Sequence, residues 1–301
     1  MDSLTHALVA AILAYALGLP QILPFFVLGA VIIDADILFS FFSRRHPSLY
    51  LFIHGGIAHS LAGAVAMAVL AYTGILLAAA SGVISPAVIA GAGPAGAGAV
   101  FGGAFLHLVM DLPATPGIPL IAPVSDRKFS LFALPGPSIL LMGVSLFFAI
   151  WMALGVVTLA EGMAVYAAIF CTFLLVRAAA FLASRPALRG AVRAIPQVNP
   201  LRWLAIYDHA DAWEVQEYRI GFGRVGSAAV YPKFTQMSEK EAASYLALPE
   251  VRRLRYHSYI VTAERSGEMI TFSDPLRVSG KIFYPPHDKQ VRIPAGKQVV
   301  P

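Results

Sequence analysis

Seven histidine and aspartate residues lie within or at the ends of the apolar segments in the first part of the sequence: His6, Asp34, Asp36, His54, His59, His107 and Asp111. Ionisable side chains are costly in apolar surroundings, and where they occur there they usually serve a function. Imidazole and carboxylate groups are ligands of Zn, Mn and Fe, and clustered carboxylates repel one another unless a cation lies between them. The set therefore predicts a divalent metal site, with Zn first, Mn or Fe as alternatives, and one to three ions.

The spacing of the aspartates constrains how they can share an ion. His107 and Asp111 are four residues apart, which places both on one face of a helix. Asp34 and Asp36 point about 200° apart on a regular α-helix, at 3.6 residues per turn. Both can therefore bind only if the helix opens, or if one of them supports a ligand from behind.

His54 and His59 form a third pair, and two glycines lie between them. Gly55 and Gly56 follow His54, so we expect His54 in a loop that precedes a helix containing His59 and Ser60. One ion would use three or four of the seven groups, which leaves room for a second ion.

The composition of the chain places these residues in a membrane. Of 301 residues, 58% are hydrophobic and 13% are charged, whereas soluble domains are about 45–50% apolar and about 25% charged. Residues 1–183 carry 5 basic and 6 acidic side chains, and residues 184–301 carry 17 and 11. We therefore expect a helical membrane domain over 1–183, a basic linker over 184–200 and a small soluble α+β domain over 201–301. A cytosolic enzyme and a disordered chain are excluded.

Six segments approach the ~20 apolar residues that a spanning helix needs. They are residues 4–19, 22–42, 57–80, 88–112, 138–159 and 163–183. Arginine and lysine occur after the second, fourth and sixth segments and are absent from the alternate connections. The positive-inside bias then predicts that these three connections and both termini are cytoplasmic. This topology brings the seven residues, from four helices, to one depth near the cytoplasmic boundary.

The same residues are compatible with other functions. A metal-ion transporter would use them as a transport site, and a non-catalytic membrane protein would use them to respond to metal or lipid. A transporter predicts further polar residues toward the outer half of the spans, where the first four segments have almost none. The sequence contains no HExxH and no GxSxG motif, which argues against an intramembrane zinc protease and a serine hydrolase. We interpret the glycine-rich stretch 91–103 as helix packing.

Five blocks of the first 135 residues, in order and spacing, resemble the YdjM family of membrane-bound, metal-dependent hydrolases. The blocks are THALVA, DAD, HGGIAHS, HLVMD and LPATPGIPLIAPVSDRKFSL. The resemblance implies metal-ligand roles for all seven residues. The family's distant relation to zinc-dependent phospholipases C and single-strand nucleases implies a phosphoester substrate. Gly55 and Ala58 stand where the family pattern has Arg and Thr.

We therefore expect a membrane-embedded hydrolase at the cytoplasmic leaflet, with membrane lipid as its partner and no nucleic acid. A bound metal would lower the pKa of a water molecule and polarise the scissile bond. Asp36 is the predicted general base, with Asp34 as a close alternative. Ser60, Arg127 and Lys128 are the predicted substrate-binding residues, although the basic pair would serve equally well as a membrane anchor. The Pro-rich loop before this pair is predicted to cover the site.

The pattern changes to short strands after residue 200. Strands are predicted over 203–207, 213–220, 259–264, 269–273 and 281–285, with a hairpin turn at Ser266 and Gly267. Ser238 is the predicted N-cap of a helix over 239–246, and a second helix is predicted to start at Pro249. The histidines of this region have no partners at fixed spacing, so its role remains open between a lid, partner docking and oligomerisation.

Overall fold

The computed structural model describes residues 1–131, 133–282 and 289–297. The chain forms two compact units. The helical unit comprises residues 1–41 and 51–179, and the sheet unit comprises residues 42–50 and 180–301. The short segment 42–50 thus belongs with the C-terminal part of the chain, although its first residues, 42–45, end a helical stretch that could cross a membrane.

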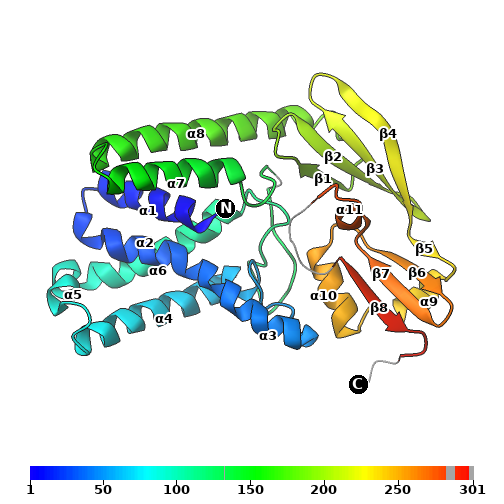
Figure 1. The fold of residues 1–301 in the computed structure, drawn as a ribbon, viewed down its shortest axis with the longest axis horizontal. Helices are drawn as coiled ribbons and strands as arrows, with labels where there is room; N and C mark the ends of the chain where they lie inside the picture. Colours follow the sequence, from blue (N-terminus) through cyan, green and yellow to red (C-terminus); the bar gives the residue numbers. More distant parts are fainter. Residues whose placement is uncertain (132, 283–288, 298–301) are drawn as a thin grey trace. The chain divides into compact units, whose positions relative to one another are not determined.

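The helical unit is built from α-helices linked by short 3₁₀ helices (Figure 1). They are α1 (Ser3–Ala16), η1 (Pro20–Ile22), α2 (Leu23–Ile32), η2 (Ile33–Phe39), η4 (Ile57–His59), α4 (Leu61–Ala80), α5 (Pro86–Ala92), α6 (Pro94–Asp111), α7 (Ile139–Ala153) and α8 (Leu159–Ser184). Helices α3 (Ser40–Arg45) and η3 (Pro47–Leu49) follow η2 and lead into the loop before η4.

Within the part of the chain that the structure describes, three helical stretches could cross a membrane by length and composition: Pro20–Arg45, Leu61–Ala80 and Leu159–Ser184. Helices α5 and α6 together make a fourth candidate, but they meet at an angle of 83°. The bend lies at Gly93, whose φ of 54° favours glycine, and Pro94 then starts α6. The first and fifth predicted segments form shorter apolar helices, α1 and α7. Of the six spans expected from the sequence, three or four are thus supported.

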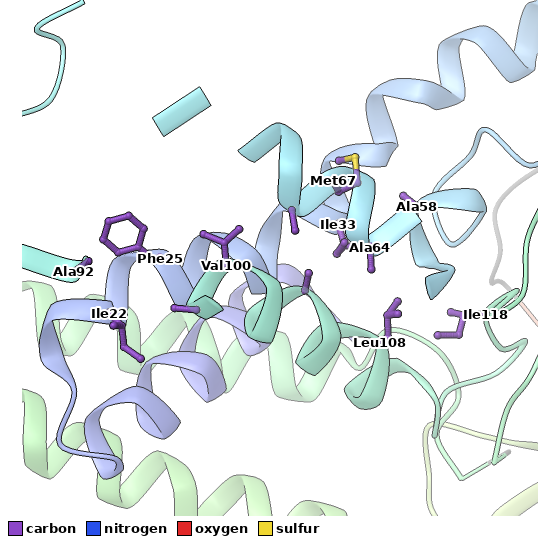
Figure 2. Close-up of a cluster of buried hydrophobic side chains, with 13 residues drawn as sticks. Ile22, Phe25, Ile33, Ala58, Ala64, Met67, Ala92, Val100, Leu108 and Ile118 are labelled. Atoms are coloured by element: carbon purple, nitrogen blue, oxygen red, sulfur yellow. The ribbon is translucent and has the colours of Figure 1, made fainter. Parts of the chain in front are cut away.

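Helices α2, α4 and α6 surround the main hydrophobic core of the helical unit. Figure 2 shows this cluster, which includes Phe25, Met67, Val100, Leu108 and, from the loop after α6, Ile118. The outer faces of the helices carry large exposed apolar side chains such as Leu70, Leu140 and Leu175. Because a water-soluble surface rarely carries so many, these faces suit contact with lipid.

Two glycines allow α2 and α6 to approach closely. A Cβ atom on Gly103 would lie 2.1 Å from the carbonyl oxygen of Phe26, and one on Gly29 would lie 2.0 Å from that of Val100. Only a residue without a side chain fits at such a backbone contact. The glycine-rich stretch therefore serves helix packing at Gly103, which is the role that the sequence favoured.

The sheet unit contains two four-stranded sheets (Figure 1), with strand orders β1-β2-β3-β4 and β5-β6-β7-β8. Their strands are β1 (Arg193–Pro196), β2 (Arg202–Asp208), β3 (Ala212–Arg219), β4 (Gly223–Pro232), β5 (Phe234–Thr235), β6 (Thr262–Ser266), β7 (Met269–Ser273) and β8 (Gln290–Pro294). The first sheet is antiparallel throughout, and in the second only β5 and β6 pair in parallel. The helices of the unit are α9 (Glu239–Ala243), α10 (Pro249–His257) and α11 (Pro275–Val278).

The strand predictions hold for β2, β3, β6 and β7, and fail elsewhere. Strand β1 lies inside the segment that the sequence assigned to a linker. Strands β4 and β8 were missed, the former because Gly, Ser and Ala break its alternation. The predicted strand 281–285 is wrong at its first two residues, which are not in a strand, and 283–285 lie outside the described residues. Ser238 does cap α9, accepting a hydrogen bond from the amide of Glu241, and Pro249 does start α10.

Candidate metal centre

The structure brings all seven predicted ligands together in what we call the His/Asp cluster. Their donor atoms form three groups, each with all atoms within 4.8 Å of one another: His6, His107 and Asp111; Asp34, His59 and His107; Asp36, His54 and His59. His107 and His59 each belong to two groups and so connect them. The cluster draws on α1, η2, the loop before η4, η4 itself and the last turns of α6.

Local winding explains how two aspartates separated by a single residue reach one cluster. Asp34 and Asp36 lie in η2, where the chain tightens from an α-helix to a 3₁₀ helix. At about 3.0 residues per turn, alternate residues are separated by only about 120° around the axis, compared with about 160° in an α-helix. The sequence predicted that His59 lies within the following α-helix. This was wrong, because His59 lies in the separate 3₁₀ turn η4.

Five of the six distances among four atoms at the middle of the cluster suit ligands of one metal ion. The Nε2 atoms of His59 and His107 are 3.1 Å apart. Oδ1 of Asp34 lies 3.6 and 3.5 Å from them, and Oδ2 of Asp111 lies 3.5 and 3.6 Å from them. Ligand atoms that each lie about 2.0–2.1 Å from a tetrahedral Zn²⁺ are separated by about 3.3 Å. Most of these contacts are too long for hydrogen bonds, yet they suit four ligands around one ion.

The tautomers of the two central histidines strengthen this reading. Nδ1 of His107 lies 2.6 Å from the carbonyl oxygen of Ala30, which can only accept, so Nδ1 carries the proton and donates. Nδ1 of His59 likewise donates to Oδ2 of Asp36, at 3.0 Å. In the neutral forms of both rings, the two Nε2 atoms carry lone pairs, and these atoms lie 3.1 Å apart. Either a proton held between them or a bound metal cation removes the repulsion between the lone pairs.

Buried atoms without hydrogen bonds also fit a cation site. Among the described residues, Oδ1 of Asp34 and both ring nitrogens of His6 are buried without a hydrogen-bond partner. Nε2 of His6 lies 3.3 Å from Oδ1 of Asp111, and its ring stacks on that of His107 at 3.8 Å between centroids. Oδ1 of Asp111 also accepts from the α-amino group of Met1. Because unpaired buried polar atoms are costly, the donor set is suited to a bound cation.

Asp36 supports the cluster from behind the central atoms. Its carboxylate accepts from Nδ1 of His54 at 2.9 Å, from Nδ1 of His59 and from the backbone amide of Gly55 at 3.2 Å. Such contacts orient the rings of metal-binding histidines and set which nitrogen faces the ion. The sequence left open whether both aspartates bind the ion or one of them supports a ligand. The contacts fit the second arrangement, with Asp34 as the ligand and Asp36 as the support.

A model of the YdjM inner membrane protein family matches residues 1–185, more than half of the chain. The chain belongs to the YdjM inner membrane protein family. The matched region contains the whole His/Asp cluster and every candidate span, so the resemblance seen in the five sequence blocks is confirmed. Comparison with curated proteins and with solved structures gave no match.

In this YdjM-family chain, the predicted substrate-binding residues differ in their surroundings. Oγ of Ser60 accepts from the amide of Gly63 at 2.9 Å and donates to the carbonyl of Ile57 at 2.8 Å. It is buried as the N-cap of α4, a role that leaves its hydroxyl engaged within the chain. Arg127 is exposed, with its guanidinium 5.6 Å from the centroid of the Phe129 ring. A substrate role for Arg127 and Lys128 stays a prediction.

The Pro-rich loop that precedes the basic pair is packed against the core. The backbone of Ile118 exchanges hydrogen bonds with Phe129 at 3.0 and 2.9 Å. The amide of Leu61 donates to the carbonyl of Leu120 at 2.9 Å. Because Leu61 starts α4 two residues after His59, this bond holds the loop beside a central ligand.

One contact of the cluster was not anticipated from the sequence. Ser3 donates from its hydroxyl to Oδ2 of Asp34 at 2.5 Å. Ser3 lies three residues before His6, so both share one face of α1. This spacing in the sequence could have predicted that Ser3 lies beside the cluster.

Replacing Asp36 with asparagine should weaken zinc binding about 10- to 100-fold, the usual cost of losing a supporting carboxylate. The amide has one accepting oxygen and cannot accept from both His54 and His59. Titration of the detergent-purified protein against a chromophoric zinc chelator measures the affinity. Asp208→Asn, at an exposed carboxylate paired with Lys233, is the matched control. Unchanged affinity of the Asp36 variant would contradict the orienting role.

Proposed function

We propose that this protein is a membrane-embedded, metal-dependent hydrolase that cleaves a phosphoester in a lipid-like substrate at the cytoplasmic leaflet. The observation that carries the proposal is the pair of imidazole Nε2 atoms 3.1 Å apart, flanked by the carboxylates of Asp34 and Asp111. Such a buried arrangement has little purpose without a cation. A cation with oxygen and nitrogen ligands in turn favours hydrolytic chemistry.

Three or four of the residues His59, His107, Asp34 and Asp111 would hold the first ion, and a water molecule would take the remaining or an added coordination position. Zn²⁺ fits this donor set best, and Mn²⁺ or Fe²⁺ are alternatives. A bound divalent ion would acidify a water molecule and stabilise the negative charge that develops on the phosphoryl oxygens. The outer group of His6, His107 and Asp111 offers a place for a further ion.

His54 is the member of the cluster that is best placed to exchange protons with a substrate. Its side chain is 27% exposed, whereas the side chain of Asp36 is 1% exposed. Asp36 holds Nδ1 of His54 at 2.9 Å and so directs the opposite ring nitrogen away from itself. An imidazole backed by a carboxylate is a common general acid and base. We therefore assign proton transfer to the His54–Asp36 pair, in place of Asp36 alone.

A lipid substrate follows from the surroundings of the cluster. The positive-inside bias places the connection after Asp111, with Arg127 and Lys128, on the cytoplasmic side. Basic residues at that depth attract anionic head groups. The exposed apolar faces of the helices would contact acyl chains, and each buried CH₂ contributes about 0.8 kcal/mol. A soluble phosphoester lacks this contribution and should bind much more weakly.

The purified protein, reconstituted with Zn²⁺ or Mn²⁺, should release a phosphorylated or free head group from at least one member of a phospholipid panel. His107→Ala should abolish this release, because it removes a central ligand, and His209→Ala, at an exposed residue of the sheet unit, should leave it intact. Mass spectrometry of lipid and water-soluble products measures the reaction.

The same preparation distinguishes the other functions. Metal-dependent cleavage of a peptide, a soluble nucleotide or single-stranded nucleic acid, with no lipid turned over, would contradict the lipid assignment. Metal uptake into sealed vesicles without hydrolysis would favour a transporter. Metal binding with neither hydrolysis nor uptake would favour a sensor.

A further inference from the structure

Segment 42–50, which we call the strap, joins the two halves of the His/Asp cluster in the sequence. Asp34 and Asp36 precede it, and His54 and His59 follow it. The strap contains the end of α3 and the short helix η3, and it packs within the sheet unit. The segment that separates four cluster residues along the chain is therefore held by the C-terminal part of the protein.

A buried arginine of α10 binds the beginning of the strap. Nη1 of Arg253 donates to the carbonyl oxygen of Ser43 at 2.8 Å. Both residues are buried, with 7% of Arg253 and none of Ser43 exposed. A charged donor on a buried carbonyl makes one of the stronger hydrogen bonds in proteins. The bond therefore fixes the backbone of the strap at this point.

Two further side chains of α10 hold the end of the strap. The guanidinium of Arg252 lies 4.7 Å from the centroid of the Tyr50 ring, and the ring of Tyr256 meets that of Tyr50 edge-on at 5.3 Å. Tyr50 is buried. Cation–π and edge-to-face contacts of this kind depend on geometry and resist sliding. Helix α10 thus grips the strap at both ends.

We infer that α10 positions the metal centre through the strap, with Arg253 as the positioning residue. The inference rests on the proposed metal centre. His54 lies four positions after Tyr50, so it can lie at most about 14 Å from Tyr50 along a fully extended chain. The hydrogen bond between Asp36 and His54 closes the stretch between them into a loop, with the cluster at its base. Because ligands must be held within about 0.5 Å of their productive positions, displacement of the strap disturbs the cluster.

This inference gives the C-terminal part a function that the sequence left open. In this inference, it supports a loop that carries cluster residues at both ends. Loops are the less rigid elements of a fold, and ligands on them need external support.

The test is the affinity of the full-length, detergent-purified protein for Zn²⁺ alone, measured by chelator competition. Arg253→Ala should weaken it about tenfold, the lower end of the range for losing a group that orients a ligand directly. Arg253→Lys should restore most of the affinity, since an ammonium group can also donate to the Ser43 carbonyl. Arg255→Ala removes the same charge from an exposed position of the same helix and should have no effect. Tyr50→Ala should resemble Arg253→Ala.

Two results would overturn the inference: wild-type affinity in the folded Arg253→Ala and Tyr50→Ala variants, or an equal loss in Arg255→Ala. If Arg253→Ala does not fold, Arg253→Lys and Tyr50→Ala decide the question by the same readout. A wild-type protein that binds no Zn²⁺ would instead overturn the proposed metal centre, and that failure would be visible before any variant is measured.

Discussion

His59→Ala and His107→Ala should each reduce the affinity for Zn²⁺ by about 100-fold or more, beyond the 10- to 100-fold typical of outer-shell changes. Each removes one of the two nitrogens that lie 3.1 Å apart at the middle of the cluster, and an ion that loses one protein ligand is held less tightly. Elemental analysis of the purified protein and chelator competition measure the loss.

Thermal unfolding supplies an independent readout of the same prediction. A ligand that binds only the folded state stabilises it, by about 2.7 kcal/mol at 100 times Kd. Added Zn²⁺ should therefore raise the unfolding temperature of the wild type and of His209→Ala, and should leave that of His59→Ala and His107→Ala nearly unchanged. Full zinc occupancy in both cluster variants would show that the four central atoms do not share an ion.

Gly103→Ala should disrupt both the fold of the helical unit and the metal centre. Its Cβ would lie 2.1 Å from the carbonyl oxygen of Phe26, a backbone atom that cannot move unless α2 and α6 separate. Overpacking of this kind costs about 1–3 kcal/mol or more. Separation would also break the 2.6 Å contact between His107 and the Ala30 carbonyl, so zinc affinity should fall together with stability.

Gly98→Ala is the matched control for this substitution. Gly98 lies on the same helix, and a Cβ atom added there would meet no atom of a neighbouring element within 4 Å. An alanine there should be neutral or should stabilise the helix by up to about 1 kcal/mol. Thermal unfolding in detergent and zinc titration compare the two variants. Equal behaviour of the two would refute the close approach of α2 and α6.

Residue type and spacing in the sequence were sufficient to identify the membrane character, the family and the seven members of the cluster. Buried ionisable residues stand out in an apolar sequence because nothing else in it is as costly to bury. His107 and Asp111 could be assigned to one helix face because four-residue spacing has only one meaning on an α-helix. The number of spans was less well predicted, since α1 and α7 are apolar but short, and apolar composition alone does not reveal where a helix ends.

Distances between helices were decided by the tertiary structure alone. Gly29 and Gly103 lie far apart in the sequence, and their backbone contacts bring α6 close enough for His107 to bond to Ala30 of α2. Asp34 and Asp36 look equivalent in the sequence, but they differ in the 3₁₀ helix η2. Asp34 places Oδ1 near Nε2 of His107, whereas Asp36 accepts hydrogen bonds from Nδ1 of His54 and His59. The grip of α10 on the strap joins residues about 200 positions apart. Local sequence encodes helix periodicity and caps, whereas such contacts depend on how whole elements pack, because each needs partners that no local pattern specifies.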